Sequence, residues 1–171
     1  LVEQIDHLSK IAFDFSQFAN IGNTHPEKFE LKDVIEPLKD LYQMNESAEI
    51  TVSGLTSGMI LFNDKTQLNR LFTNLFQNAM EAGSQKEKRI IEINVISENG
   101  KVRISMKDNG DGIPEEMQSR IFSPNFTTKT SGTGLGLAMW TGIVEKSGGS
   151  IWFETETGKG TTFIVELPLA V

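Results

Sequence analysis

Asn74, Asn78 and Glu81 are the first residues along the chain whose types and spacing suit a chemical role. Successive spacings of four and three place their side chains on one face of a helix. Amide and carboxylate oxygens are ligands that a hard cation such as Mg²⁺ prefers. The same polar side chains also suit the solvated face of an ordinary amphipathic helix. Taken alone, the spacing leaves both interpretations open.

A second candidate is the segment DNGDGIP, which begins at Asp108 and follows the alternating run KVRISM. It does not fit an EF-hand calcium loop, because aligning Gly110 or Gly112 with the loop glycine puts Ser105 or Lys107 at the first ligand position. What remains is a carboxylate at the end of a strand, with glycines that let a flat ligand approach the backbone. Such a carboxylate can accept a hydrogen bond from an exocyclic amine, as in adenine. A simple polar turn is the alternative.

A third candidate is the segment 122–134, which is rich in glycine, serine and threonine and precedes an expected helix. The backbone N–H groups of Gly132, Gly134 and Gly136, together with a helix start, would make an anion site. The pattern is not a P-loop, which needs G-x4-G-K-[ST]. It is not the G-x-G-x-x-G dinucleotide fingerprint either, because Met139 stands at the third glycine position. A polar segment of this length predicts a mobile lid.

The surrounding pattern predicts an α+β domain that positions these segments. Helices are expected over roughly 31–42, 65–83, 114–121 and 135–147, and strands over 49–53, 58–62, 89–97, 101–107, 150–156 and 161–167. The dipeptide Asn99-Gly100 predicts a tight hairpin turn. The last two strands form a hairpin closed by TGKG, and the hydroxyl of Thr161 in it can support a bound ligand. We expect a two-layer α/β sandwich, with a mixed, mostly antiparallel sheet and helices on one face.

Single residues predict several helix ends. Pro37 indicates a bend or a late start in the first of these helices. Asp64 and Gln67 resemble a capping box at the start of the second helix, and Gly83 suits its end. Pro114 suits the first turn of the short third helix.

A separate helix is expected before the domain. Apolar residues in the first 20 positions recur at alternating spacings of four and three, which predicts a seam for a partner helix. Gly22 and Pro26 then break the pattern, and we place a boundary near residues 20–28. The domains are therefore expected to be 1–22 and 23–171.

The composition excludes several classes of protein. The 171 residues are 38% hydrophobic and 23% charged, as in a soluble globular domain. The absence of cysteine excludes disulfides and thiolate metal sites, and a net charge of −7 argues against a nucleic-acid partner. No apolar run approaches the roughly 20 residues of a membrane helix. Because the chain begins at Leu1, we expect it to be a piece of a longer protein.

The order of the four segments is more specific than any one of them. A helix with N-x-x-x-N, then D-x-G-x-G, two phenylalanines, G-x-G-x-G and finally G-T-x-F closely resembles the ATP-binding domain of sensor histidine kinases. That superfamily also includes DNA gyrase and mismatch-repair ATPases. The resemblance covers about residues 28–168 and implies a Bergerat-type ATP-binding fold. Residues 1–22 look like the second helix of the dimerisation and phosphoacceptor hairpin, with the first helix absent.

The resemblance implies ATP and Mg²⁺ as cofactors. Asn78 would hold Mg²⁺, with Asn74 and Glu81 nearby. Asp108 would accept from the adenine amino group, and Thr161 would support it through a water molecule. The implied nucleotide-binding residues are Asp108, Gly110, Gly112, Phe122, Phe126, Thr127, Thr128, Gly132, Thr133, Gly134, Leu135, Gly136 and Thr161.

Within this set, Phe122 and Phe126 would anchor the lid, the three lid glycines would wrap the phosphates, and Lys129 would add a cation there. One departure is Asn125, where related sequences often carry a second aromatic residue. It leaves the packing of the lid open.

The family also suggests the type of reaction. In its ATP-hydrolysing branches, the residue one turn before the metal-binding asparagine is a glutamate that activates water, and here that residue is Asn74. An amide is no general base, so we expect phosphoryl transfer to a protein side chain rather than hydrolysis. The expected catalytic residues are Asn74, Asn78 and Lys129. The acceptor is expected outside this chain, because neither His7 nor His25 has the family's histidine-acid pattern.

The implied partners are the kinase's own dimerisation domain and the receiver domain of a response regulator, with a homodimeric full-length protein. The resemblance implies a cytoplasmic domain and leaves open whether the full-length protein is anchored in the inner membrane. Two alternatives remain at this point. One is a superfamily ATPase or anti-sigma-type serine kinase, and the other is a nucleotide-binding module without chemistry.

Overall fold

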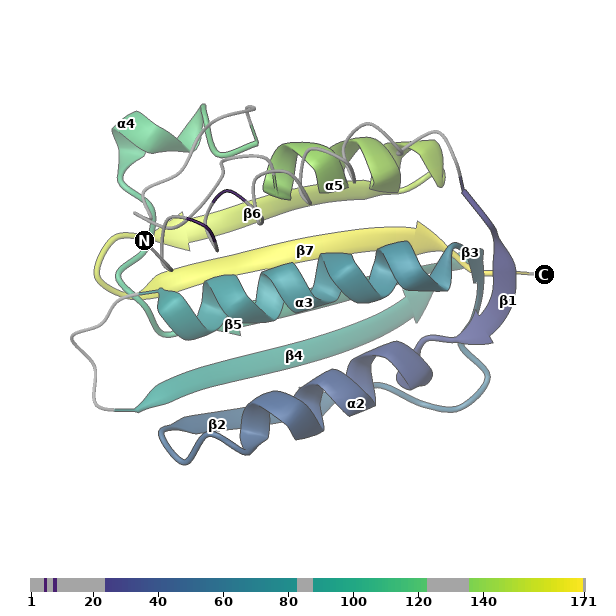
Figure 1. Ribbon diagram of the computed structural model, residues 1–171, viewed down its shortest axis with the longest axis horizontal. Helices are drawn as coiled ribbons and strands as arrows, with labels where there is room; N and C mark the ends of the chain where they lie inside the picture. The colour runs from purple at the N-terminus through teal and green to yellow at the C-terminus, as the bar shows by residue number, and fades with distance from the viewer. Residues whose placement is uncertain (1–4, 6–7, 9–23, 83–87, 123–135, 171) are drawn as a thin grey trace.

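The fold is a twisted five-stranded sheet with helices packed on one face (Figure 1). The computed structural model describes residues 5, 8, 24–82, 88–122 and 136–170. Its elements are β1 (Glu27–Glu30), α2 (Lys32–Gln43), β2 (Ala48–Ser53), β3 (Ile60–Asn63), α3 (Lys65–Glu81), β4 (Arg89–Glu98), β5 (Lys101–Asp108), α4 (Glu115–Gln118), α5 (Gly136–Lys146), β6 (Ser150–Glu156) and β7 (Gly160–Pro168).

The strand order in the main sheet is β2-β4-β5-β7-β6. β2 runs parallel to β4, and the other three pairings are antiparallel. Helices α2, α3 and α5 lie over the same face of the sheet, with α3 in the middle (Figure 1). The predicted class, a mixed and mostly antiparallel sheet covered on one side, is confirmed.

The central hairpin follows the sequence closely. β4 and β5 pair from Ile91–Asp108 to Glu98–Lys101, and the turn residues Asn99 and Gly100 both have positive φ, at 53° and 74°. This is the backbone that a two-residue type I′ turn requires, which explains the Asn-Gly pair. The predicted inward residues of both strands are buried: Ile91, Ile93, Val95, Val102, Ile104 and Met106.

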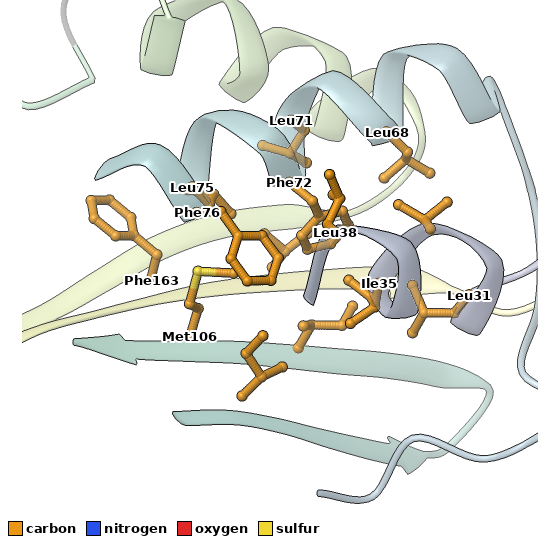
Figure 2. Close-up of a cluster of buried hydrophobic side chains, with 14 of the residues drawn as sticks. Leu31, Ile35, Leu38, Leu68, Leu71, Phe72, Leu75, Phe76, Met106 and Phe163 are labelled. Carbon is orange, nitrogen blue, oxygen red and sulfur yellow. The ribbon is translucent and has the colours of Figure 1, made fainter. Parts of the chain in front are cut away.

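The core lies between this inner face and the helices. Figure 2 shows side chains from α2 and α3 directed at Met106 and Phe163 of the sheet. The core face predicted for α3 is buried throughout: Leu68, Leu71, Phe72, Leu75 and Ala79, with Phe76 in addition. At about 25 cal/mol per Å² of buried apolar surface, this layer supplies the main driving force for folding.

The helix ends match their sequence signals in part. Asp64 caps α3, because its side chain accepts from the Gln67 backbone N–H at 3.1 Å. The reciprocal bond of a capping box, from the Asp64 backbone N–H to the Gln67 side chain, is absent, and this N–H donates to Asn63 Oδ1. α5 ends in a Schellman motif: Gly148 has φ 82°, and the Gly149 N–H donates to the carbonyl of Val144. α3 ends at Glu81, and Gly83 lies outside the described residues.

Three expectations differ from the structure. Pro37 neither delays nor ends α2, which begins five residues earlier and continues to Gln43. The third helix, α4, is shorter than predicted. The strand β1 was missed, and β3 pairs with it antiparallel in a separate two-stranded sheet. Its signal was short, because Phe29 is the only buried residue of β1. The expected helix over 1–20 lies outside the described residues except for Ile5 and Leu8, which are helical and exposed.

Candidate nucleotide-binding site

Polar residues occupy one end of the otherwise apolar inner face of the sheet. The register places Asp108 of β5 beside Ile91 of β4 on one side, and one step beyond the Lys107–Thr162 pair on the other. Thr161 of β7 pairs in turn with Thr155 of β6. A single row across four strands therefore runs from Ile91 through Asp108 and Thr161 to Thr155. The polar residues of this row lie on the inward faces of their strands, which are apolar elsewhere. They are therefore candidates for ligand contacts.

Asp108 is only 4% exposed. Its Oδ1 accepts from the backbone N–H of Gly110 at 2.8 Å and from that of Thr161 at 3.2 Å. Buried carboxylates are costly unless they are hydrogen-bonded, and these two donors fix the direction of the carboxyl group. The sequence predicted a carboxylate at the end of this strand, and the structure places it there.

Thr161 and Thr155 form a hydroxyl pair beside this carboxylate. Their Oγ1 atoms are 2.9 Å apart, and Thr155 Oγ1 also accepts from the Ile113 backbone N–H at 2.9 Å. Thr155 therefore ties the segment after Asp108 to the edge strand β6. Sequence reasoning named Thr161 but missed Thr155, although Thr155 follows Ile151 and Phe153 at the same alternating spacing.

The glycines around Asp108 are required by neighbouring backbone. A Cβ on Gly110 would lie 2.0 Å from the carbonyl oxygen of Ala82, and one on Gly112 would lie 2.5 Å from that of Glu156. Gly160, at φ 135°, approaches the Asp108 carbonyl as closely, with a Cβ at 2.0 Å. These close approaches bring the end of α3, the Asp108 segment and the β6–β7 hairpin together. Asp111 is exposed, as expected for a turn residue.

The asparagines of α3 share one helix face, as predicted. Asn78 Nδ2 donates to Asn74 Oδ1 at 3.1 Å, and both side chains are half-buried. Glu81, the last residue of the helix, is exposed.

Next to this helix, burial raises the pKa of the Tyr42 hydroxyl. A hydrogen bond with Gln77 opposes this rise in pKa, and the charge of Glu81 adds to it. In the described part of the chain, no three acidic, histidine or cysteine residues gather into a metal site.

Two further residues at this end were missed. Arg89, which begins β4, is buried, and its Nε donates to the carbonyl of Met80 in α3 at 3.3 Å. Asn109 follows Asp108 and accepts from the Ile90 backbone N–H at 3.0 Å. The available signal was the alternation itself, because Arg89 precedes Ile91 and Ile93 on the inward side of the strand.

The lid expectations fall mainly outside the described residues. Phe122 is described, and its ring packs against Phe153 at 5.8 Å and Phe163 at 6.4 Å between centroids. It therefore lies over the same end of the sheet. Gly136 begins α5. The predicted site residues outside the described part are Phe126, Thr127, Thr128, Lys129, Gly132, Thr133, Gly134 and Leu135.

Comparison with known proteins identifies the family. A family model described as "Histidine kinase-, DNA gyrase B-, and HSP90-like ATPase" matches residues 63–171. The chain belongs to this family. The match spans the segments from α3 to β7 on which the resemblance rested, so this ATPase family is confirmed.

Individual relatives of the ATPase domain support the same family. The chain is 40% identical to the sensor histidine kinase ZraS of Escherichia coli (strain K12) over 63% of its own length and 23% of that protein. It resembles the solved catalytic domain of histidine kinase ThkA, with 34% identity, a TM-score of 0.73, and coverage of 85% of this chain and 97% of that one. The chain spans about a quarter of the length of the curated relatives it matches.

Two more solved structures contain other molecules. Full-length ShkA, solved with AMPPNP, has 25% identity and a TM-score of 0.80, covering 97% of this chain and 36% of that one. ThkA in complex with the response regulator TrrA has 27% identity and a TM-score of 0.78, covering 99% of this chain and 49% of that one.

Within the described residues of the ATPase domain, every helix is too short or too polar to span a bilayer.

Proposed function

We propose that this domain binds Mg·ATP at the polar end of the sheet and is the catalytic domain of a sensor histidine kinase. The observation that carries the proposal is the buried carboxylate of Asp108, fixed by the backbone N–H groups of Gly110 and Thr161. The family membership supports it, and so does the AMPPNP complex of full-length ShkA, which this chain resembles.

The arrangement around Asp108 suits adenine better than guanine. A carboxylate accepts from the 6-amino group of adenine, whereas the 6-oxo group of guanine would face it as a second acceptor. The hydroxyl of Thr161 lies beside it and would complete the contact, directly or through water. We infer that this carboxylate is the main determinant of base selectivity.

The amide face of α3 fits a magnesium ion. Asn78 bonds Asn74 through Nδ2, and Oδ1 of the same amide is the atom that would bind a cation. An amide oxygen, with Glu81 one turn further along the same face, matches the oxygen ligands that Mg²⁺ takes beside phosphates. Bound there with ATP, the ion would neutralise charge on the phosphates. Asn74 would orient Asn78 and would have no capacity to act as a base.

Transfer of the γ-phosphate to a histidine of a dimerisation domain is the reaction that these residues support best. A loose phosphoryl-transfer transition state needs positioning and charge neutralisation more than a protein base. The lid residues, Lys129 and the three lid glycines among them, would enclose the phosphates. The proposed partners are a phosphoacceptor domain, which would end at a boundary near residue 22, and a response regulator. The ThkA–TrrA complex is a precedent for the response regulator. We further propose a homodimeric full-length protein and a cytoplasmic location for this domain.

Calorimetry on the chain with Mg·ATP and Mg·GTP tests the nucleotide assignment. We expect ATP to bind and GTP to bind far more weakly. Asp108→Asn should lose at least about tenfold in ATP affinity, since a charge-assisted hydrogen bond is replaced by an amide whose N–H faces the adenine amino group. Asp111→Asn is the matched control, because Asp111 is exposed three residues further on. Equal ATP affinity in the two variants would remove Asp108 from the site.

Incubation with γ-labelled ATP tests the reaction. The chain alone should stay unlabelled and release phosphate slowly. Strong labelling at His7 would contradict an external acceptor, and rapid phosphate release would favour an ATPase over a kinase.

A further inference from the structure

Arg89 is the only buried positively charged side chain in the part of the chain that the structure describes, with 7% exposure. It continues the inward-facing row of β4, where Ile91, Ile93 and Val95 are all apolar. A buried guanidinium is retained in an apolar row only where it makes specific hydrogen bonds. Its position therefore calls for a structural or functional reason.

One nitrogen of the Arg89 guanidinium holds α3. Arg89 Nε donates at 3.3 Å to the carbonyl of Met80, in the last turn of the helix. The last four carbonyls of a helix lack intrahelical partners, and the negative end of the helix dipole attracts a cation. The last turn of α3 contains no basic residue of its own. Arg89 supplies that charge from the neighbouring strand.

A second nitrogen of the same guanidinium holds the segment that follows Asp108. Arg89 Nη1 donates to Asn109 Oδ1 at 3.4 Å. The same Oδ1 accepts from the Ile90 backbone N–H at 3.0 Å, and Asn109 Nδ2 donates to the Lys88 carbonyl at 3.0 Å. The side chain of Asn109 thus bonds the backbone of β4 just beyond the Ile91–Asp108 pair, where the backbone pairing of β4 and β5 ends.

A direct backbone contact lies next to these bonds. Gly110 approaches Ala82 so closely that a Cβ on it would lie 2.0 Å from the Ala82 carbonyl oxygen. The end of the helix that carries Asn78 and the segment that carries Asp108 are therefore held together by non-covalent contacts. Arg89 bonds to both sides.

We propose that Arg89 and Asn109 form a positioning clamp that sets the distance between the metal-binding face of α3 and the adenine-binding carboxylate. The inference rests on the proposed function, in which Mg·ATP contacts both places at once. A ligand that bridges two elements binds tightly only if their spacing is fixed beforehand. Loosening the clamp should therefore reduce the gain in ATP affinity that Mg²⁺ provides more than it reduces the ATP affinity without Mg²⁺.

The test compares ATP affinity with Mg²⁺ and with EDTA, and takes the ratio of the two dissociation constants as the magnesium enhancement. Arg89→Met keeps the volume and removes the bonds to Met80 and Asn109, whereas Arg89→Lys keeps the charge near α3 but cannot bridge as a fork. Asn109→Ser removes the other partner. In all three variants the enhancement should fall by about fivefold or more, while affinity in EDTA changes by less than about threefold. Arg89→Lys should do so at nearly wild-type thermal stability.

Arg103→Met is the matched control. Arg103 lies on the outer face of β5, where it bonds Glu166 and stacks over Trp152, and its loss should leave the enhancement unchanged. The double variant R89M/N109S should lose no more than R89M alone if the two residues act as one clamp. A lower melting temperature with an unchanged enhancement, or an equal loss with and without Mg²⁺, would overturn the proposal.

Amide hydrogen exchange without nucleotide provides the second readout. In R89M, exchange should accelerate in the last turn of α3 and at residues 108–110, with no change in β6 and β7. If the wild-type chain failed to bind ATP at all, the proposed function would fall, and this measurement would still decide the clamp. Unchanged exchange at those residues would refute it.

Discussion

Asn78 donates its side-chain N–H to the Oδ1 of Asn74, one helical turn earlier, at 3.1 Å. This bond gives the two asparagines different roles, although the sequence presents them as equivalent. Asn74 is the residue that orients, and Asn78 is the residue whose carbonyl oxygen is oriented. A side chain that is ordered in advance loses less entropy when it binds a ligand.

Asn74→Ala should therefore reduce the affinity for Mg·ATP by about 3- to 10-fold, the usual worth of one hydrogen bond. Asn74→Asp should keep the affinity near the wild-type value, because a carboxylate accepts the same N–H. Titration calorimetry with Mg²⁺ measures both. Thr73→Ala, which removes a local bond to the Asn69 carbonyl, is the control on the same helix. The assignment fails if the Asn74 and Thr73 alanine variants bind alike.

Gly160→Ala should destabilise the domain and disturb the site together. The new Cβ would overlap the carbonyl of Asp108, and the residue has φ 135°. We expect a loss of at least about 3 kcal/mol in the free energy of unfolding. Gly158→Ala is the comparison, since its φ is 84° but its Cβ would meet nothing within 4 Å. It should cost only about 1 kcal/mol. Urea unfolding of the two variants decides, and equal losses would contradict the close approach.

Gln43→Ala should open an edge of the sheet. The Gln43 amide donates to the Ala48 carbonyl at 2.7 Å and accepts from the Ile50 N–H at 2.8 Å, on the side of β2 that faces away from β4. Its loss should cost about 1–2 kcal/mol and promote edge-to-edge association. Unfolding and light scattering at rising concentration test this prediction. Glu36→Ala, an exposed change on the same helix, should do neither.

Glu166 should make stability depend on acid pH. A hydrogen bond from Arg103, aided by the charges of Arg103 and Lys101, holds the pKa of this carboxyl below its ordinary value of 4.5. A lowered pKa in the folded state stabilises the fold above the ordinary value, and the gain is lost as pH falls through the folded value. The wild type should exceed Glu166→Gln in stability near neutral pH, and the difference should shrink as pH falls below 4.5. A constant difference across that range would exclude the ion pairs as its cause.

Local signals allowed much of the fold to be predicted. Asn99 and Gly100 specify their turn by their own conformations, and the face of α3 is visible in the spacing of its apolar residues. The buried position of the Asp108 carboxylate could be predicted because Asp108 ends an alternating strand, and its role in binding stays a prediction. Each of these features depends on residues close together in the sequence.

The features that were missed depend on long-range pairing. Nothing within β2 indicates that it runs parallel to β4, and nothing within β3 selects β1 as its partner. The alternation places Arg89 and Thr155 on the inward side of their strands, but their partners Met80, Asn109 and Thr161 are known only from the folded structure. The roles of the glycines could not be predicted either, since Gly110 is fixed by the carbonyl of Ala82 on another element.

The strand order also has a consequence for how the domain acquires its structure. β4 and β5 are joined by two residues, so their pairing closes a very short loop and should form early. β3 and α3 separate β2 from β4 in the sequence, so the pairing of β2 with β4 closes a much longer loop and should form later. Asp108 ends β5 of the early hairpin, whereas α3 lies in the longer loop between β2 and β4, so the two halves of the proposed site belong to different stages of folding. A refolding chain should gain protected amides in the β4–β5 hairpin before it gains affinity for nucleotide.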